Sequence, residues 1–136
     1  MRRRVCLDTG PVQLHYLKDS PTKVEDLFQD IKNDRFDAIV PETILVEVFK
    51  HLCVSGGKDY ASDVINLIYN EIVLQIIPLT RPVVLAAGKL KCQYRDSLSY
   101  NDTIVIATAV QERAEIHTTE KEWPEIPKLE VVKYKF

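Results

Sequence analysis

Short apolar segments rich in β-branched residues alternate along the chain with longer segments in which apolar residues recur every three or four positions. The short segments predict five strands, over Arg3–Leu7, Asp37–Val40, Leu74–Ile77, Glu115–Thr118 and Val131–Tyr134. The longer segments predict six helices, over Pro11–Lys18, Thr22–Asp34, Glu42–Val54, Asp59–Asn70, Arg81–Tyr94 and Asn101–Ala114. Strands separated by helices are typical of a parallel sheet covered on both faces, so the predicted fold class is α/β.

Composition and length indicate one folded domain over residues 1–136. The chain has 136 residues, 46% of them hydrophobic and 28% charged, and it contains no repeat, linker or low-complexity segment. No apolar stretch approaches the roughly 20 residues that span a bilayer. The apolar segment that follows the N-terminal arginines ends at Asp8, too early for a signal sequence. Three widely spaced cysteines without a C-x-x-C pair are expected to stay reduced. We therefore expect a cytoplasmic protein with no membrane partner.

The formal net charge of −2 neither attracts nor strongly repels a polyanion. A nucleic acid would therefore have to be held by local groups or through metal ions.

In parallel α/β sheets, ligands bind beyond the carboxyl ends of the strands, where the strand order reverses. Asp8 ends the first predicted strand and is followed by Thr9. Capping of the next helix is the competing interpretation for this carboxylate. The Asp-Thr-Gly triplet of aspartic proteases belongs to an all-β fold, and a phosphoryl-transfer site would need a second Asp where Gly10 stands. Neither of these two readings fits the chain.

Glu47 lies on a helix whose apolar residues cover more than half of its circumference, with His51 and Lys50 beside it on the narrow polar remainder. A glutamate on so apolar a helix forms the wall of a cleft, pairs with Lys50 or His51, or is solvated at the surface. The sequence leaves these three alternatives open.

Two further acids occupy helix and strand ends. Asp102 lies at the start of a helix that is apolar in nearly every direction, where it also completes a loose capping box with Ser99. Glu120 follows the fourth strand and has Glu122 as a close neighbour. An acidic, solvated turn is the competing interpretation for both glutamates.

The order of these motifs carries more information than any one of them. An apolar strand ending in Asp-Thr, a glutamate on an apolar helix, Leu98-Ser99-x-x-Asp102 running into Ile-Ala-Thr-Ala, and an apolar strand followed by Thr-x-Glu-Lys-Glu-Trp occur in succession. This pattern resembles the PIN domain family, and within it the small stand-alone kind that includes the VapC toxins of toxin–antitoxin pairs. The resemblance extends from about Arg3 to Tyr134 and implies a five-stranded sheet in the order 3-2-1-4-5.

The resemblance implies an endoribonuclease that depends on Mg²⁺ or Mn²⁺. Its metal ligands and catalytic acids would be Asp8, Glu47, Asp102 and Glu120, and Thr9 and Thr118 match positions that support the ligands through hydroxyl groups. Hard divalent cations prefer oxygen ligands, and they stabilise charge on an attacked phosphodiester.

The chain departs from the family pattern at Glu120, where Asp is more common. One extra methylene moves the carboxylate in a site whose metal demands near-octahedral geometry, so the number of ions, one or two, is left open. Glu122 is the alternative ligand at this end of the site.

The partners implied are a single-stranded or structured RNA, a small antitoxin protein that covers the acidic cleft, and a second copy of the chain in a homodimer. Phosphates of the RNA would meet basic residues on the fifth helix and the turn after it, and an aromatic ring beside Asp102 would stack on a base. These residues are Lys89, Lys91, Arg95 and Tyr100.

Three alternatives remain. The first is a catalytically degenerate PIN-like module that binds RNA or protein, motivated by Glu120. The second is a PIN-type RNA-processing nuclease without an antitoxin. The third, a receiver-like signalling domain, is disfavoured because it wants an acidic pair at the end of the first strand, where Thr9 and Gly10 follow Asp8.

Overall fold

The computed structural model describes residues 2–136 and contains one five-stranded sheet. The strands are β1 (Arg3–Leu7), β2 (Phe36–Pro41), β3 (Leu74–Ile77), β4 (Glu115–Thr118) and β5 (Val131–Lys133). The helices are α1 (Thr9–His15), α2 (Thr22–Lys32), α3 (Ile44–Gly56), α4 (Lys58–Asn70), α5 (Arg81–Gln93) and α6 (Tyr100–Glu112). All strand pairs are parallel and their order is β3-β2-β1-β4-β5, which confirms the predicted class and topology.

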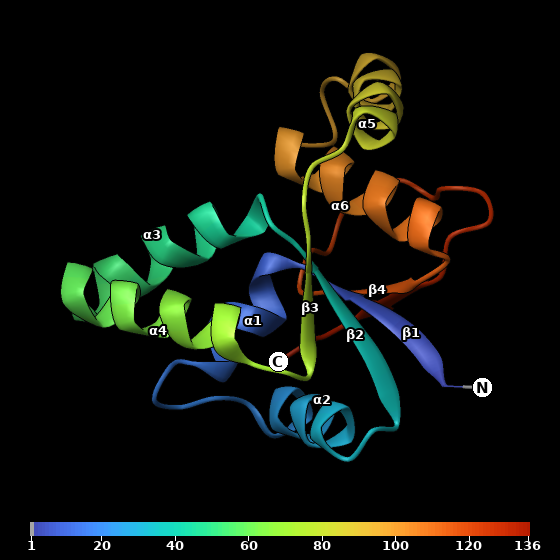
Figure 1. Ribbon diagram of the computed structural model, residues 1–136. Coiled ribbons are helices and arrows are strands. Elements are labelled where there is room, and N and C mark those ends of the chain that lie inside the picture. Colours follow the sequence, from blue (N-terminus) through green and yellow to red (C-terminus); the bar gives the residue numbers. More distant parts are fainter. Residues whose placement is uncertain (1) are drawn as a thin grey trace.

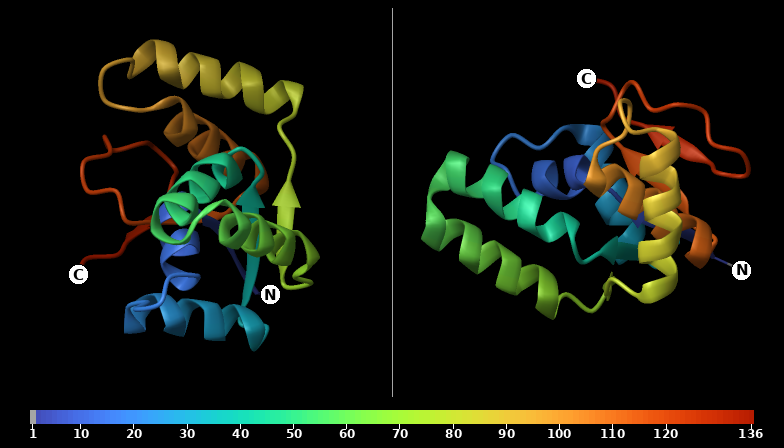
Figure 2. Two further views of the ribbon diagram at one scale, coloured as in Figure 1. Left: turned by 90° about the vertical axis from the view of Figure 1, so that its left-hand side faces the viewer. Right: turned by 90° about the horizontal axis from the view of Figure 1, so that it is seen from above.

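Helices cover both faces of the sheet (Figures 1 and 2). The crossovers from β1 to β2 and from β2 to β3 step outward in one direction, and the crossover from β3 returns past both strands to β4. Because such crossovers are right-handed, the returning pair α5 and α6 lies on the face opposite α1 to α4. The strand order therefore reverses between β1 and β4, and their carboxyl ends meet at one edge of the sheet.

The centre of the molecule is apolar on both sides of β1. Val5, Cys6 and Leu7 are fully buried, as are Val105 and Ile106 of α6. The helix α5 packs on the outer side of α6, which explains why α6 is apolar in nearly every direction. Burial on both faces is what the near-continuous apolar run of β1 indicates for a central parallel strand.

Several helix ends differ from their predicted positions by two or more residues. The helix α1 begins at Thr9 rather than Pro11, because a proline is tolerated in a first turn, where its missing N–H has no helical partner. Left-handed residues end two helices early: Asp34 (φ 65°) lies just beyond α2, and Arg113 (φ 53°) caps α6. Gly57, at φ 91°, turns the chain between α3 and α4, as the Gly-Gly pair predicts.

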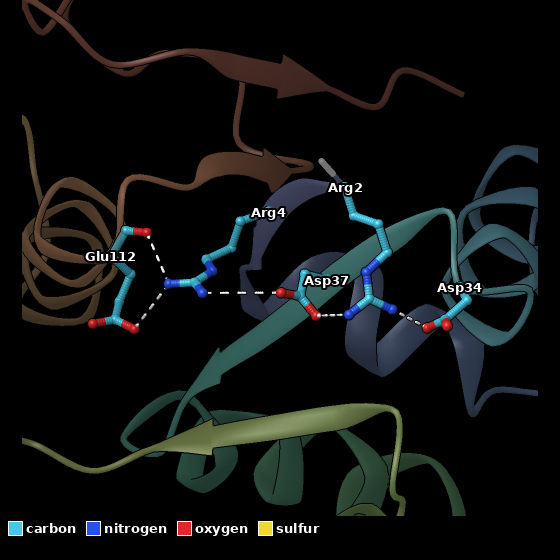
Figure 3. Close-up of polar contacts among 5 residues, drawn as sticks. All are labelled: Arg2, Arg4, Asp34, Asp37 and Glu112. Atoms are coloured by element: carbon cyan, nitrogen blue, oxygen red, sulfur yellow. Dashed lines mark hydrogen bonds and ion pairs between the residues drawn. The ribbon is translucent and has the colours of Figure 1, made fainter.

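The N-terminal arginines form a charged edge at the amino end of the sheet (Figure 3). Arg2 pairs with Asp34 and Asp37, and Arg4 pairs with Asp37 and Glu112. Arg4 also donates to the main-chain oxygen of Glu112 at 3.2 Å, which links β1 to the end of α6. The two arginine side chains are 45% and 40% exposed, so each pair contributes little to stability. These contacts lie at the opposite end of β1 from Asp8.

Within residues 2–136, no helix is both long enough and apolar enough to cross a bilayer. The cysteines are free: Cys6 is buried, Cys53 is half-buried and Cys92 is exposed.

A close contact fixes α1 against the segment that follows β4. A Cβ added at Gly10 would lie 2.0 Å from Thr119 Oγ1 and 2.9 Å from Thr119 Cβ. Gly10→Ala is therefore expected to destabilise the fold by about 1–3 kcal/mol, because two segments must separate to admit one methyl group. Urea unfolding of the purified variant measures this loss.

Gly88→Ala is the matched control, since a Cβ at that helical glycine meets nothing within 4 Å. This control is expected to stabilise α5 by up to about 1 kcal/mol. Thr119→Ala should recover part of the loss in the Gly10→Ala background. Equal effects of the two glycine substitutions would show that the contact with Thr119 does not constrain α1.

Candidate active site

Four carboxylates from four separate segments line one cavity of about 300 Å³ at the carboxyl end of β1 and β4. Asp8 follows β1, Glu47 lies in the first turn of α3, Asp102 lies in the first turn of α6, and Glu120 follows β4. The other residues of the wall are Thr9, Gly10, Gln13, His51, Ser99 and Thr119. The structure therefore brings together the four acids that the sequence singles out.

Asp8 holds the N-cap position of α1, but its side chain makes no capping hydrogen bond. It instead accepts a hydrogen bond from the hydroxyl of Thr118 at 2.7 Å, and both residues are buried. The same hydroxyl oxygen accepts a hydrogen bond from the main-chain N–H of Glu120 at 3.0 Å. Thr118, fully buried on β4, thus joins the segments that carry Asp8 and Glu120.

Glu47 forms part of the cavity wall, with its side chain 39% exposed. Two donors converge on its Oε2 atom, Thr9 Oγ1 at 3.1 Å and Asn101 Nδ2 at 3.0 Å. His51 Nε2 lies 3.7 Å from the other oxygen, Oε1. Of the alternatives left open by the sequence, the cleft wall and the proximity to His51 both hold.

Asp102 combines capping with a place at the cavity. Its Oδ2 atom accepts a hydrogen bond from the N–H of Ser99 at 3.0 Å, and its own N–H donates to Ser99 Oγ at 3.1 Å. The predicted capping box is therefore present. It holds the carboxylate at the mouth of the cavity, so the two interpretations of Asp102 are compatible.

Glu122, the alternative ligand, is exposed and lies outside the set of residues that line this cavity.

Mutual repulsion and burial act together on the acids. Burial raises the pKa of Asp8 to about 6; the Thr118 hydrogen bond opposes this rise, and the charges of Asp102 and Glu120 add to it. Burial also raises the pKa of Glu120, followed by the charges of Asp102 and Glu47. The pKa values of Asp8 and Glu120 are thus raised in part by neighbouring charges, as expected for carboxylates that share a small space.

The donor set fits a hard divalent cation. Carboxylate oxygens are the ligands that Mg²⁺ and Mn²⁺ prefer. Gln13, which lines the cavity, has a buried Oε1 atom without a hydrogen-bond partner in residues 2–136. A cation, or a water bound in the cavity, would satisfy this acceptor. Between Arg2 and Phe136, however, no three His, Cys, Asp or Glu side chains are already grouped to hold one ion. Binding would therefore require the carboxylates to turn toward each other.

The basic and aromatic residues expected to contact RNA do not line the cavity that holds the four carboxylates. Lys91, Arg95 and Tyr100 line a separate, largely apolar cavity of about 500 Å³ between α5 and α6. The Lys91 ammonium donates to the main-chain oxygens of Arg95 and Leu98, and it lies 4.9 Å from the centre of the Tyr100 ring. Lys91 therefore stabilises the turn before α6. Lys89 is exposed on α5.

Sequence reasoning missed Asn101, Gln13 and Thr119. Their signals are weak: Asn101 and Thr119 stand next to predicted ligands, and Gln13 lies one helical turn beyond Thr9. Polar residues at such positions are common on solvated helices and turns, so only the packing of distant segments distinguishes them.

The sequence matches the family model described as "PIN domain" over residues 5–129. None of the curated protein sequences matches the chain.

Solved structures share the fold at low sequence identity. VapBC2 from Rickettsia felis bound to a promoter DNA fragment has a TM-score of 0.74 at 18% identity, covering 97% of this chain and 99% of that one. DNA-bound VapBC from Salmonella typhimurium has a TM-score of 0.74 at 14% identity, covering 98% of each chain. VapC20 from Mycobacterium tuberculosis, a sarcin–ricin loop cleaving toxin, has a TM-score of 0.70 at 13% identity, covering 85% and 87%.

The raised pKa of Asp8 predicts a pH-dependent stability. Because the folded value of about 6 exceeds the ordinary 3.8, the folded chain holds this proton more tightly than the unfolded chain. The contribution of Asp8 to the free energy of unfolding is therefore fully present below about pH 4 and is lost as the pH rises through 6. In chelator at pH 7, Asp8→Asn should be the more stable protein by on the order of 2 kcal/mol, several degrees in Tm.

Thermal unfolding across the pH range checks this, because the advantage of Asp8→Asn should shrink toward about pH 4. A difference that stays constant with pH would contradict it.

Proposed function

Because the chain belongs to the PIN domain family, whose members are generally nucleases, we propose that it is a Mg²⁺- or Mn²⁺-dependent endoribonuclease that hydrolyses phosphodiester bonds of RNA. The observation that carries this proposal is the convergence of four carboxylates on one cavity at the switch between β1 and β4. That edge is where α/β sheets bind their ligands.

In this proposal Asp8, Glu47, Asp102 and Glu120 are the catalytic acids and the metal ligands. The bound cation supplies charge neutralisation at the attacked phosphate. The chain contributes position: Thr118 holds Asp8, the capping box holds Asp102, and Thr9 holds Glu47. Burial, and after it repulsion from the other acids, raises the pKa of Asp8 and Glu120. A bound cation would offset both effects, so binding should stabilise the fold.

Glu120 is the adaptable member of the set. Its N–H is anchored on Thr118, while its side chain is exposed and bears one more methylene than the Asp usual in the family. Because its backbone is fixed, the longer Glu120 side chain approaches the cavity at a different angle from an Asp at the same position. We propose that Glu120 completes the site of a first ion and holds a second ion weakly.

The proposal that the chain is the toxin of a VapBC-type pair is based on its similarity of fold to solved structures. The neighbours of similar fold include VapBC toxin–antitoxin complexes, in which the toxin is solved together with its antitoxin. We propose a small antitoxin as partner, covering the acidic cavity. A short upstream gene encoding a DNA-binding fold with a disordered tail would support this assignment, and its absence would favour an RNA-processing nuclease.

An apolar surface suggests the second copy of a homodimer. Two largely apolar cavities, of about 500 and 460 Å³, share Leu79, and one lies between α5 and α6 while the other lies on α3 and α4. Val46 on α3 is 77% exposed, and Val84 and Leu85 on α5 are 50% and 60% exposed. Soluble monomers rarely expose contiguous apolar surface of this kind.

Cleavage of a fluorescent single-stranded RNA tests the activity. With Mn²⁺ the chain should cut the RNA, chelator should stop it, and Asp8→Asn and Asp102→Asn should each lower the rate at least about a hundredfold, because a lost ligand weakens the ion and misplaces it. Asp63→Asn, at an exposed acid on α4, is the matched control and should cut at the parental rate.

Metal-dependent cleavage that survives both substitutions would refute the ligand assignment. RNA binding by the unaltered chain without cleavage would favour the catalytically degenerate alternative.

Light scattering coupled to gel filtration tests the dimer. Val84→Arg places a charge in the apolar surface and should raise the dimer dissociation constant at least about a hundredfold. Ile72→Arg is the control, since Ile72 is 97% exposed in the turn before β3 and lines neither cavity. A parent that is monomeric, or a dimer unaffected by Val84→Arg, would contradict the proposed interface.

A further inference from the structure

Asn101 connects two of the acids across the cavity. It lies in the first turn of α6, one residue before Asp102, and its Nδ2 atom donates to Glu47 Oε2 on α3 at 3.0 Å. Its amide must present the N–H₂ group to Glu47, because the amide oxygen would repel a carboxylate. This contact thus ties the position of Glu47 to the segment that carries Asp102.

Thr9 makes the equivalent connection from the other side. It follows Asp8 directly, and its hydroxyl donates to the same Oε2 atom at 3.1 Å. One oxygen of Glu47 is therefore occupied by donors that neighbour Asp8 and Asp102 in the chain. The other oxygen, Oε1, has His51 Nε2 at 3.7 Å and carries neither of these hydrogen bonds.

We propose that Asn101 is a positioning residue that commits one oxygen of Glu47 to the protein and leaves the other for the ion. This inference rests on the proposed function. Glu47 would then bind a cation through a single oxygen, which suits the small octahedral shell of Mg²⁺ and Mn²⁺. The larger Ca²⁺, which often takes both oxygens of a carboxylate, would gain less from this arrangement.

The surroundings of Glu47 explain why its carboxylate needs these two hydrogen bonds to keep its position. Its long side chain is 39% exposed and lies on the narrow polar side of a largely apolar helix. Three other carboxylates of the same cavity repel it. Without donors it would turn toward solvent, whereas hydrogen bonds to an ionised group are among the stronger ones and hold it in place.

Calorimetric titration with Mn²⁺ and with Ca²⁺ tests the role of Asn101. Asn101→Ala should weaken Mn²⁺ binding roughly tenfold and Ca²⁺ binding clearly less. In a Glu47→Gln background the same substitution should change Mn²⁺ affinity by less than about twofold, because Asn101 acts only through Glu47. Gln111→Ala, an amide at the far end of the same helix, is the control and should leave both affinities unchanged.

The NMR chemical shift of the Asn101 side-chain amide in metal-free protein is a second test of the contact with Glu47. This test needs neither an ion nor the Asn101 variant. Glu47→Gln should shift this resonance, because the acceptor loses its charge. An unshifted resonance, an Asn101→Ala protein with parental Mn²⁺ affinity, or an equal loss in both backgrounds would each overturn the inference while leaving the proposed function intact. Absence of Mn²⁺ binding by the unaltered chain would overturn both.

Discussion

The repulsion among four carboxylates in one small cavity is the constraint on which the site depends. Hydrogen-bond donors offset it at fixed points: Thr118 joins Asp8 to the segment of Glu120, and Thr9 and Asn101 join Glu47 to the segments of Asp8 and Asp102. Each donor is a residue next to an acid, or on the strand that leads to one. The side chains of Asp8 and Glu47 are therefore held by the chain segments of the other acids, while the remaining repulsion is left for a cation to remove.

The fold determines where this can happen. The parallel strands β1 and β4 pair at the centre of the sheet, so their carboxyl ends lie side by side. Residues just past the ends of both strands therefore meet, and helices from both faces add Glu47 and Asp102 to the same place. The tight approach of Gly10 to Thr119 follows from this meeting, because α1 begins immediately where the segment after β4 passes.

Much of this arrangement could be predicted from the sequence. Alternation of strand and helix patterns identified the sheet, and the rule for strand ends drew attention to Asp8 and Glu120. Helix ends were less predictable, because Arg113 adopts the left-handed conformation that ends α6 without being one of the residues, Gly or Asn, that usually signal it. The hydrogen bond of Asn101 to Glu47 was out of reach, since it joins segments more than fifty residues apart. A supporting hydroxyl at Thr118 was expected, but only through the resemblance to the family. Lys91, expected from its charge to contact RNA, also has a structural contact that the sequence did not indicate, because its ammonium donates to the turn before α6.

The central claim is that these four acids share an ion. Crystals grown with Mn²⁺ and measured at the manganese absorption edge test it most directly. The account predicts an anomalous peak inside the cavity bounded by Asp8, Glu47, Asp102 and Glu120, with Oε1 of Glu47 facing it. A cavity without such a peak at saturating Mn²⁺, or a peak held by other residues, would contradict it.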